Sequence, residues 1–387
     1  MCPERALGHR KVTDGKEPRK ALEILFWACD SSALCFFGTA GIAMQSLLRS
    51  SRPALLRRLR PQLVRPLSSN VGHWVGAPDS ELVSNMKFYY PFKDALPPIM
   101  PTYRLIDDEG VPLPGAELPD IDEETCVKMM ETMVKVNEFD RVFYDAQRQG
   151  RLSFYFTNRG EEAQAVGSAA ALAPTDWCWP QYRELGVIFY RGYTFEECAN
   201  QCTHNELDQT KGRQLPMHIG SPKLACQYVK SNLGQQVPAA NGAAYAMKLK
   251  NKGLPSPANK GVSITYFGEG CASEGDIPSA LNIAAVHGCP TIFFCRNNGY
   301  AISTHTDDQY KSDGIAPRGV AFGMPSIRVD GNDILAVYKA TQEARRIGVE
   351  EGRPTMIEGM SYRINSHSTS DDDSKYRRAE PPVHHIP

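Results

Sequence analysis

Residues 266–276 read YFGEGCASEGD, and this stretch decides how the chain is interpreted. It completes an apolar run, residues 262–267, that has the length and composition of a buried strand. Directly after this run, Glu269 stands between Gly268 and Gly270, so that a carboxylate is presented at the strand tip without bulky neighbours. The arrangement predicts a ligand site at the end of the strand.

A second strand tip carries amide side chains. The apolar residues 291–295 are followed by Arg296, Asn297 and Asn298. Ligands of parallel α/β sheets bind at the carboxyl ends of the strands, so we expect Glu269 to lie beside these asparagines. Oxygen ligands suit Mg²⁺, which leaves coordination positions free for phosphate oxygens. The glycines and the helix that follows favour an anion, so the sequence predicts a magnesium-bound diphosphate.

Two well-known nucleotide-binding motifs fit this stretch less well. A dinucleotide-binding fingerprint needs a third glycine where Ser273 stands, and a phosphate-binding P-loop needs a Gly-Lys-Ser or Gly-Lys-Thr triplet that the sequence lacks. A solvated glutamate in a turn would account for the glycines and Glu269 alone. It would not account for the Asn297-Asn298 pair at the next strand tip.

The alternation of short apolar strands with helices predicts an α/β fold, with a parallel sheet that carries helices on both faces. The expected strands are residues 262–267, 291–295 and 355–360, and the expected helices are residues 122–150, 161–172, 237–249, 276–287 and 332–351. In the first helix, apolar residues recur at spacings of three and four: Val127, Met130, Val134, Phe139, Val142, Phe143 and Ala146.

Composition limits the class of protein. Apolar residues make up 42% and charged residues 22%, as in globular proteins, and a net charge of -1 gives no electrostatic case for binding nucleic acid. The eleven cysteines are odd in number and contain no CxxC pair. This pattern predicts reduced thiols rather than a disulfide framework or a zinc site.

The N-terminal region has a different composition from the rest. Residues 44–78 contain no acidic residue and alternate arginine with leucine, which is typical of a mitochondrial presequence, although a basic disordered tail would look similar. We expect an atypical leader (1–43), a presequence (44–69), an extended arm (70–120), the α/β domain (121–364) and a polar loop with an unusual C-terminus (365–387). Residues 24–43 form a poor membrane anchor because of Asp30, so no membrane insertion of the mature chain is expected.

Several longer motifs carry a family resemblance. They are QRQGRLSFYFTNRGEEAQAVGSAAAL, QYRELGV, YFGEGCASEGD, FFCRNNGYAIST, SIRVDGND and HSTSDD. Together they resemble the alpha subunits of branched-chain 2-oxo acid dehydrogenases, in the thiamine-diphosphate-dependent family, from about Tyr103 to Arg378. The resemblance implies the thiamine-diphosphate-binding fold, with thiamine diphosphate and Mg²⁺ as cofactors.

The resemblance also implies roles for individual residues. Glu269, Asn298 and the backbone carbonyl of Tyr300 would bind Mg²⁺. The residues that would contact thiamine diphosphate are Gln181, Tyr182, Arg183, Ser231, Leu233, Gly270, Cys271, Arg296 and His367. His367 would also be catalytic, and phosphorylation of Ser368 would switch the enzyme off. Cys271 stands where the family usually has alanine.

The resemblance also raises the question of a potassium ion. Family members hold it in a loop that matches Lys230, Asn232, Gln235 and Gln236. Here Gln235 replaces a threonine and Lys230 brings a positive charge, so the sequence leaves potassium binding open.

The function implied is decarboxylation of branched-chain 2-oxo acids, with transfer of the acyl group to lipoyl arms. The implied partners are a beta subunit in an α2β2 tetramer, a lipoyl-bearing acyltransferase core, and a regulatory kinase and phosphatase. The implied location is the mitochondrial matrix. Two alternatives remain: a pyruvate dehydrogenase alpha subunit, and a non-catalytic paralogue, because the C-terminus looks truncated.

Overall fold

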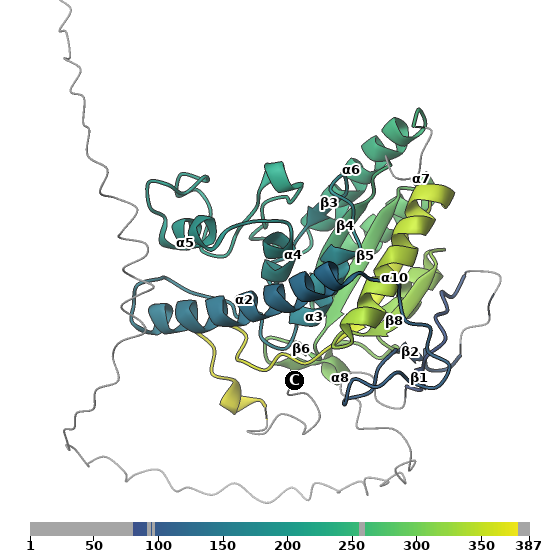
Figure 1. The fold of residues 1–387 in the computed structure, drawn as a ribbon, viewed down its shortest axis with the longest axis horizontal. Helices are drawn as coiled ribbons and strands as arrows, with labels where there is room; N and C mark the ends of the chain where they lie inside the picture. The colour runs from purple at the N-terminus through teal and green to yellow at the C-terminus, as the bar shows by residue number, and fades with distance from the viewer. Residues whose placement is uncertain (1–79, 91–93, 95–96, 255–259, 378–387) are drawn as a thin grey trace, which may run out of the picture. The chain divides into compact units, whose positions relative to one another are not determined.

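The computed structural model describes residues 80–90, 94, 97–254 and 260–377 (Figure 1). These residues belong to the second of two units into which the chain divides, residues 72–387. The expected leader and presequence lie outside the described residues, as does the chain after residue 377. Among the described residues, no helix combines the length and apolar character needed to cross a membrane. The eight described cysteines are all free thiols, as expected.

The centre of the described part is a sheet of seven strands, all paired in parallel. Across the sheet the strands are β1 (Leu82–Val83), β2 (Thr102–Tyr103), β8 (Ser326–Asp330), β9 (Thr355–Met360), β5 (Thr291–Asn297), β4 (Ser263–Gly268) and β3 (Trp177–Trp179). Strands β9, β5 and β4 were predicted, and the parallel α/β fold is confirmed. The expected extended arm supplies β1 and β2, which its proline-rich sequence did not predict.

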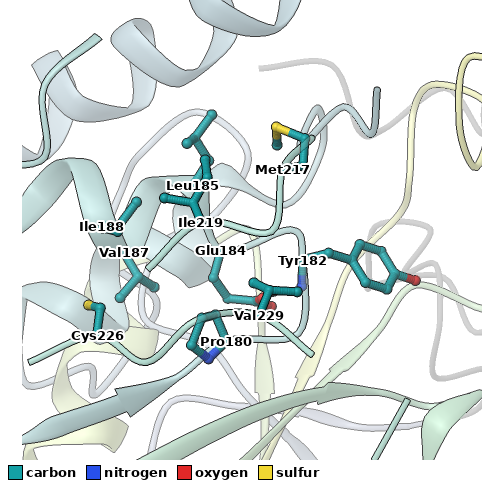
Figure 2. A pocket seen from close by; sticks show the side chains of 10 residues that line it. All are labelled: Pro180, Tyr182, Glu184, Leu185, Val187, Ile188, Met217, Ile219, Cys226 and Val229. Atoms are coloured by element: carbon teal, nitrogen blue, oxygen red, sulfur yellow. The ribbon is translucent and has the colours of Figure 1, made fainter. Parts of the chain in front are cut away.

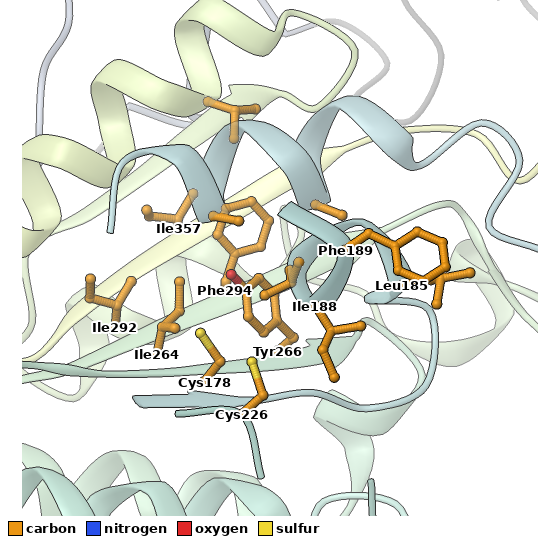
Figure 3. Packing of buried hydrophobic residues seen from close by; sticks show 14 of the residues in the cluster. Cys178, Leu185, Ile188, Phe189, Cys226, Ile264, Tyr266, Ile292, Phe294 and Ile357 are labelled. Atoms are coloured by element: carbon orange, nitrogen blue, oxygen red, sulfur yellow. The ribbon is translucent and has the colours of Figure 1, made fainter. Parts of the chain in front are cut away.

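Side chains of the central strands alternate between two cores, as the two-residue period of a strand requires. In β5, Ile292 and Phe294 join one apolar cluster, whereas Phe293 and Cys295 join the other. The first cluster also contains Ile357 of β9 (Figure 3). Both faces of the sheet are therefore buried, which is why the strands read as continuous apolar runs.

Helices cover both faces. The first cluster packs under α2 (Glu123–Arg148), α3 (Glu162–Ala170), α4 (Leu185–Tyr190) and α10 (Ile334–Arg346). The second packs under α6 (Gln236–Asn251), α7 (Asp276–His287) and α9 (Ala316–Ala321). Shorter elements complete the described chain: α5 (Phe195–Thr203), η1 (Pro222–Leu224), η3 (Cys271–Ser273), β6 (Tyr300–Ala301), β7 (Thr304–His305), α8 (Thr306–Gln309), η4 (Ile347–Glu351) and η5 (Asp373–Lys375).

Helix α2 begins where expected, but several of the apolar residues whose spacing predicted it are exposed. Asp122 caps the helix by accepting a hydrogen bond of 2.7 Å from the backbone N–H of Thr125. Its first half buries Met129, Thr132 and Val136. Three apolar residues whose spacing helped to predict the helix, Val127, Met130 and Val134, are exposed there. Their spacing of three and four fits either side of the helix, so periodicity alone could not choose between the two sides.

The register between β4 and β5 positions the functional region. Gly268 pairs with Arg296 at the last step of the ladder. Glu269 and Asn297 therefore leave the sheet at the same edge and at the same height. The side-by-side arrangement expected from the sequence follows from this pairing.

Candidate functional site

The carboxylate of Glu269 is buried at the end of β4. Its Oε2 accepts a hydrogen bond of 3.3 Å from the backbone N–H of Asn298, while its Oε1 is buried and accepts no hydrogen bond from any described residue. Burial, together with the negative charge of Glu161, raises the pKa of Glu269 to about 7. A buried carboxylate oxygen without a partner is costly, and a cation would satisfy it.

Asn298 and Tyr300 continue this arrangement. The side-chain oxygen of Asn298 accepts a hydrogen bond of 3.2 Å from the backbone N–H of Tyr300. The described residues contain no group of three His, Cys, Asp or Glu side chains able to hold a metal. A cation beside Glu269 would therefore rely on a single carboxylate together with amide and carbonyl oxygens, the mixed oxygen set that Mg²⁺ accepts.

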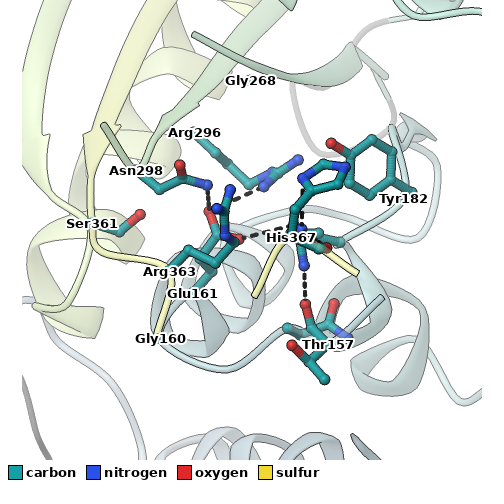
Figure 4. A network of polar contacts seen from close by, with 12 residues as sticks. Thr157, Gly160, Glu161, Tyr182, Gly268, Arg296, Asn298, Ser361, Arg363 and His367 are labelled. Atoms are coloured by element: carbon teal, nitrogen blue, oxygen red, sulfur yellow. Dashed lines mark hydrogen bonds and ion pairs between the residues drawn. The ribbon is translucent and has the colours of Figure 1, made fainter. Parts of the chain in front are cut away.

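Next to Glu269 lies a buried cluster of charges that centres on Glu161 (Figure 4). Glu161 precedes α3, and its Oε1 accepts hydrogen bonds of 3.1 Å from the Arg296 guanidinium and 3.1 Å from the Asn298 amide. Its Oε2 lies 3.6 Å from Nε of Arg183. One carboxylate thus gathers both arginines that were expected to bind phosphate and the asparagine that was expected to bind metal.

Arg296 remains charged in this setting. Burial would lower the pKa of Arg296, but Glu184 and Glu161 outweigh it and raise that pKa above its ordinary value. Glu184 forms an ion pair with Nε of Arg296, and it accepts a hydrogen bond of 3.0 Å from the backbone N–H of Tyr182. A third buried guanidinium, Arg363, lies nearby (Figure 4) and donates to the backbone carbonyls of Tyr300 at 3.4 Å and Ile302 at 3.1 Å. Arg183 and Arg296 therefore bring two buried guanidinium groups to the site, and guanidinium donors suit an anion such as phosphate.

The predicted residues between β3 and α4 form one wall. The side-chain oxygen of Gln181 accepts a hydrogen bond of 2.8 Å from the backbone N–H of Gly268. This bond connects the wall to the glycine turn, residues 268–270. The Tyr182 ring stacks on Phe156, with centroids 4.7 Å apart, and meets the imidazole of His367 edge-on at 6.0 Å. Tyr182 is also one of the residues that line a small apolar pocket, together with Val187, Met217 and Val229, although its ring points away from these three side chains (Figure 2).

His367 joins the cluster from the far end of the chain. Its Nδ1 lies 3.3 Å from the guanidinium of Arg183, and its backbone N–H donates to Asp371 at 2.8 Å. Burial and the positive charges of Arg183 and Arg363 lower the pKa of His367 to about 3. The imidazole is therefore neutral at physiological pH. Ser368 follows it and is half-buried.

Gly270 and Cys271 form the floor of the turn. A Cβ at position 270 would lie 2.6 Å from the side chain of Ala301, so only glycine fits there without movement. Cys271 is buried, and its sulfur lies 3.8 Å from the position that a Cβ on Gly234 would take. The thiol fills space in the turn.

We expect the thiol of Cys271 to resist alkylation. Burial raises its pKa to about 12, so almost no thiolate forms at pH 8, and the thiolate is the reactive species. Iodoacetamide at pH 8 should modify the exposed Cys126 within minutes and leave Cys271 unmodified in the folded chain. Peptide mass spectrometry measures both sites in one sample, and rapid labelling of Cys271 before Cys126 would contradict this expectation.

The remaining predicted residues lie in the segment before α6, and most of them are exposed. Ser231, Leu233, Lys230, Asn232 and Gln235 all expose their side chains. Leu233 is 40% exposed. The structure shows none of these five in hydrogen-bonded contact with the cluster around Glu161.

Gln236 differs from its exposed neighbours because it is buried and donates to the backbone carbonyl of Tyr266 at 3.0 Å. A side-chain amide used in this way ties α6 to β4. The potassium site stays a prediction.

Two residues of the site were missed from the sequence. Glu161 looks like an ordinary acid at the start of a helix, and only its burial shows a different role. Gln309 donates to the backbone carbonyl of Glu269 at 2.9 Å and to Ser273 at 3.1 Å, so it holds the glycine turn. The sequence offered only a weak signal for Glu161, namely that two acidic residues, Glu161 and Glu162, directly follow Gly160.

Comparisons with known proteins agree with this geometry. A family model described as the dehydrogenase E1 component matches residues 130–383. The chain is similar to mitochondrial proteins named 2-oxoisovalerate dehydrogenase subunit alpha. It is 51% identical to that of Caenorhabditis elegans over 73% of this chain and 64% of the relative. It is 52% identical to that of Homo sapiens over 73% of this chain and 62% of the relative.

A plant relative gives the same result. The chain is 50% identical to 2-oxoisovalerate dehydrogenase subunit alpha 2 of Arabidopsis thaliana over 72% of this chain and 58% of the relative. The chain therefore spans about three fifths of the length of these curated relatives.

Proposed function

Because the chain belongs to the dehydrogenase E1 component family, we propose that it is the alpha subunit of a branched-chain 2-oxo acid dehydrogenase. The family depends on thiamine diphosphate. The substrate class rests on the relatives, which are named for 2-oxoisovalerate. The observation that carries the proposal is the buried, unpartnered oxygen of Glu269 beside two buried arginines.

The residues present fit a metal-bound diphosphate. The free Oε1 of Glu269 offers a ligand to Mg²⁺, and the Asn298 side chain and the Tyr300 carbonyl are close neighbours in the chain. Arg183 and Arg296 offer guanidinium donors, which match phosphate oxygens in geometry. We assign Mg²⁺ to Glu269, Asn298 and Tyr300. We assign the diphosphate to Arg183 and Arg296.

When bound, thiamine diphosphate supplies the electron sink that decarboxylation of a 2-oxo acid requires. The chain itself would bind the phosphate charge, exclude water and orient the reacting groups. His367, which is neutral and packs against Arg183 and Tyr182, can donate or accept one hydrogen bond without adding charge. Tyr182 and Phe156 hold its ring in place from one side.

We propose a beta subunit as the partner. The residues that we assign to the metal and the diphosphate include none that supplies the carboxylate needed to activate the aminopyrimidine ring. A beta subunit would bring this acid to a shared site in an α2β2 tetramer. The tetramer would transfer acyl groups to a lipoyl-bearing acyltransferase core. We place it in the mitochondrial matrix, in agreement with relatives that are named mitochondrial.

The test is ligand-induced stabilisation followed by turnover. The chain, co-expressed with its beta partner, should show a higher Tm when thiamine diphosphate and Mg²⁺ are added together, because a ligand that binds only the folded state stabilises it. Turnover should be faster with 3-methyl-2-oxobutanoate than with pyruvate. No change in Tm would favour a non-catalytic paralogue, and a preference for pyruvate would overturn the substrate class.

Phosphorylation of Ser368 should inactivate the assembled enzyme. A phosphate with nearly two negative charges beside His367 would repel a carboxylate substrate and disturb the loop. We expect at least about tenfold lower turnover after treatment with the cognate kinase, and recovery after treatment with the phosphatase. Ser368→Ala should keep its activity under the same kinase treatment. Full activity of a chain with stoichiometric phosphate on Ser368 would contradict the expectation.

A further inference from the structure

The segment that carries His367 has one buried anchor. Within residues 365–377, Thr369 alone is buried, with 5% of its surface exposed. We call residues 365–377 the His367 loop. Its other residues are half-buried or exposed, so the contacts of Thr369 decide how firmly this part of the loop is held.

Thr369 pairs reciprocally with Tyr155. The backbone N–H of Thr369 donates to the carbonyl of Tyr155 at 3.0 Å, and the backbone N–H of Tyr155 donates to Oγ1 of Thr369 at 3.0 Å. Arg148, the last residue of α2, donates to the carbonyl of Thr369 at 3.3 Å. The hydroxyl therefore satisfies a buried backbone donor that would otherwise lack a partner.

Tyr155 is in turn fixed to α2. Its side chain is fully buried, and its hydroxyl donates to Oδ1 of Asp140 at 2.8 Å. Asp140 also accepts two hydrogen bonds from Asn158, one from its side-chain amide at 3.0 Å and one from its backbone N–H. Asp140 thus holds both ends of the short segment 155–158 against a long helix.

The same segment also holds the arginine that His367 meets. The carbonyl of Thr157 accepts a hydrogen bond from the guanidinium of Arg183. One stretch of backbone therefore fixes Arg183 through Thr157 and the His367 loop through Tyr155. Arg183 also donates directly to the backbone carbonyl of His367, and the shared support places the two residues so that its guanidinium lies 3.3 Å from Nδ1 of His367.

We propose that Thr369 and Tyr155 are positioning residues that seat His367 against Arg183, with Asp140 holding Tyr155 in place. Their importance for turnover rests on the function proposed above, but their effect on the loop does not. Neither residue belongs to the groups assigned to the metal or the phosphates, and both act through the placement of His367.

Thr369→Val tests the proposal because valine keeps the shape and removes the oxygen. In the assembled holoenzyme, we expect amide hydrogen exchange in the His367 loop to rise about tenfold, because one hydrogen bond is lost and the N–H of Tyr155 loses its acceptor. The kcat should fall about tenfold, and KM for the 2-oxo acid should change less than about twofold. Thr369→Ser, which restores the oxygen, should return both values to within about twofold of wild type.

Two further variants keep the test decisive. Tyr155→Phe removes the bond to Asp140 and should raise loop exchange in the same direction. Ser370→Ala alters an exposed neighbour in the same loop and should change neither exchange nor turnover. Unchanged loop exchange in Thr369→Val, or failure of Thr369→Ser to restore it, would overturn the proposal. Loop exchange is read without substrate, so the proposal can fail while the proposed function stands, and the reverse also holds.

Discussion

Glu269→Gln should abolish the stabilisation of the assembled protein by thiamine diphosphate and Mg²⁺ and lower turnover by at least about a hundredfold. The substitution keeps the size of the side chain and removes the anionic oxygen that Mg²⁺ would neutralise. Without this ligand the metal and the diphosphate would be held less tightly, and without the bound cofactor the chain lacks the electron sink that decarboxylation requires. The measurements are Tm with and without the two ligands, and kcat with saturating 3-methyl-2-oxobutanoate.

A matched control lies on the same turn. Glu274→Gln changes an exposed acid five residues away and should leave both the ligand-induced rise in Tm and turnover unchanged. Without ligands, Glu269→Gln should fold at least as well as wild type, since it removes a buried carboxylate with an unsatisfied oxygen. A variant that keeps the full rise in Tm would remove Glu269 from the metal site.

Glu161→Gln should lower the free energy of unfolding of the ligand-free chain by about 3–5 kcal/mol, the usual result of removing one partner from a buried ion pair. Arg183 and Arg296 are both buried and both face Glu161, so the loss leaves Arg183 without a paired carboxylate, whereas Arg296 keeps Glu184. We expect thiamine diphosphate with Mg²⁺ to stabilise this variant more than wild type, because the bound anion would replace the missing charge.

The measurement is denaturant unfolding with and without the two ligands. The control is Glu131→Gln, which breaks an exposed pair with Lys135 on α2 and should change stability little. If the free energy of unfolding of Glu161→Gln lies within about 1 kcal/mol of wild type, Glu161 is not the centre of the cluster. An unchanged response to ligand would show that the arginines do not meet the diphosphate.

Strands and helices with a clear apolar period were predictable. The helix at residues 276–287 and the strand at residues 355–360 have the bounds expected from their apolar pattern. Strand β8 was missed because its buried residues include Arg328, which the structure pairs with Glu358. A charged residue in a sequence segment predicts that the segment is exposed. Arg328 can be buried only because Glu358, on the neighbouring strand β9, neutralises its charge.

The candidate site was predictable where residues follow a strand tip. Glu269 and Asn298 were placed together from the parallel sheet rule alone. His367 was named only through the family resemblance, because nothing in a polar loop indicates that it folds back on Arg183. Glu161 was missed because its partners are spread over residues 183–298, and no local pattern connects them.

The pairing of Gly268 with Arg296 has a consequence for how such a chain can vary. Alternate side chains of β4 and β5 enter opposite cores, so a single-residue insertion in either strand would turn every following side chain to the wrong side. The two tips would also lose their common height. Insertions and deletions within β4 and β5 are therefore excluded, both by the packing of the two cores and by the site. The connections at the opposite edge of the sheet can lengthen or shorten without moving the carboxylate of Glu269 relative to the amide of Asn298.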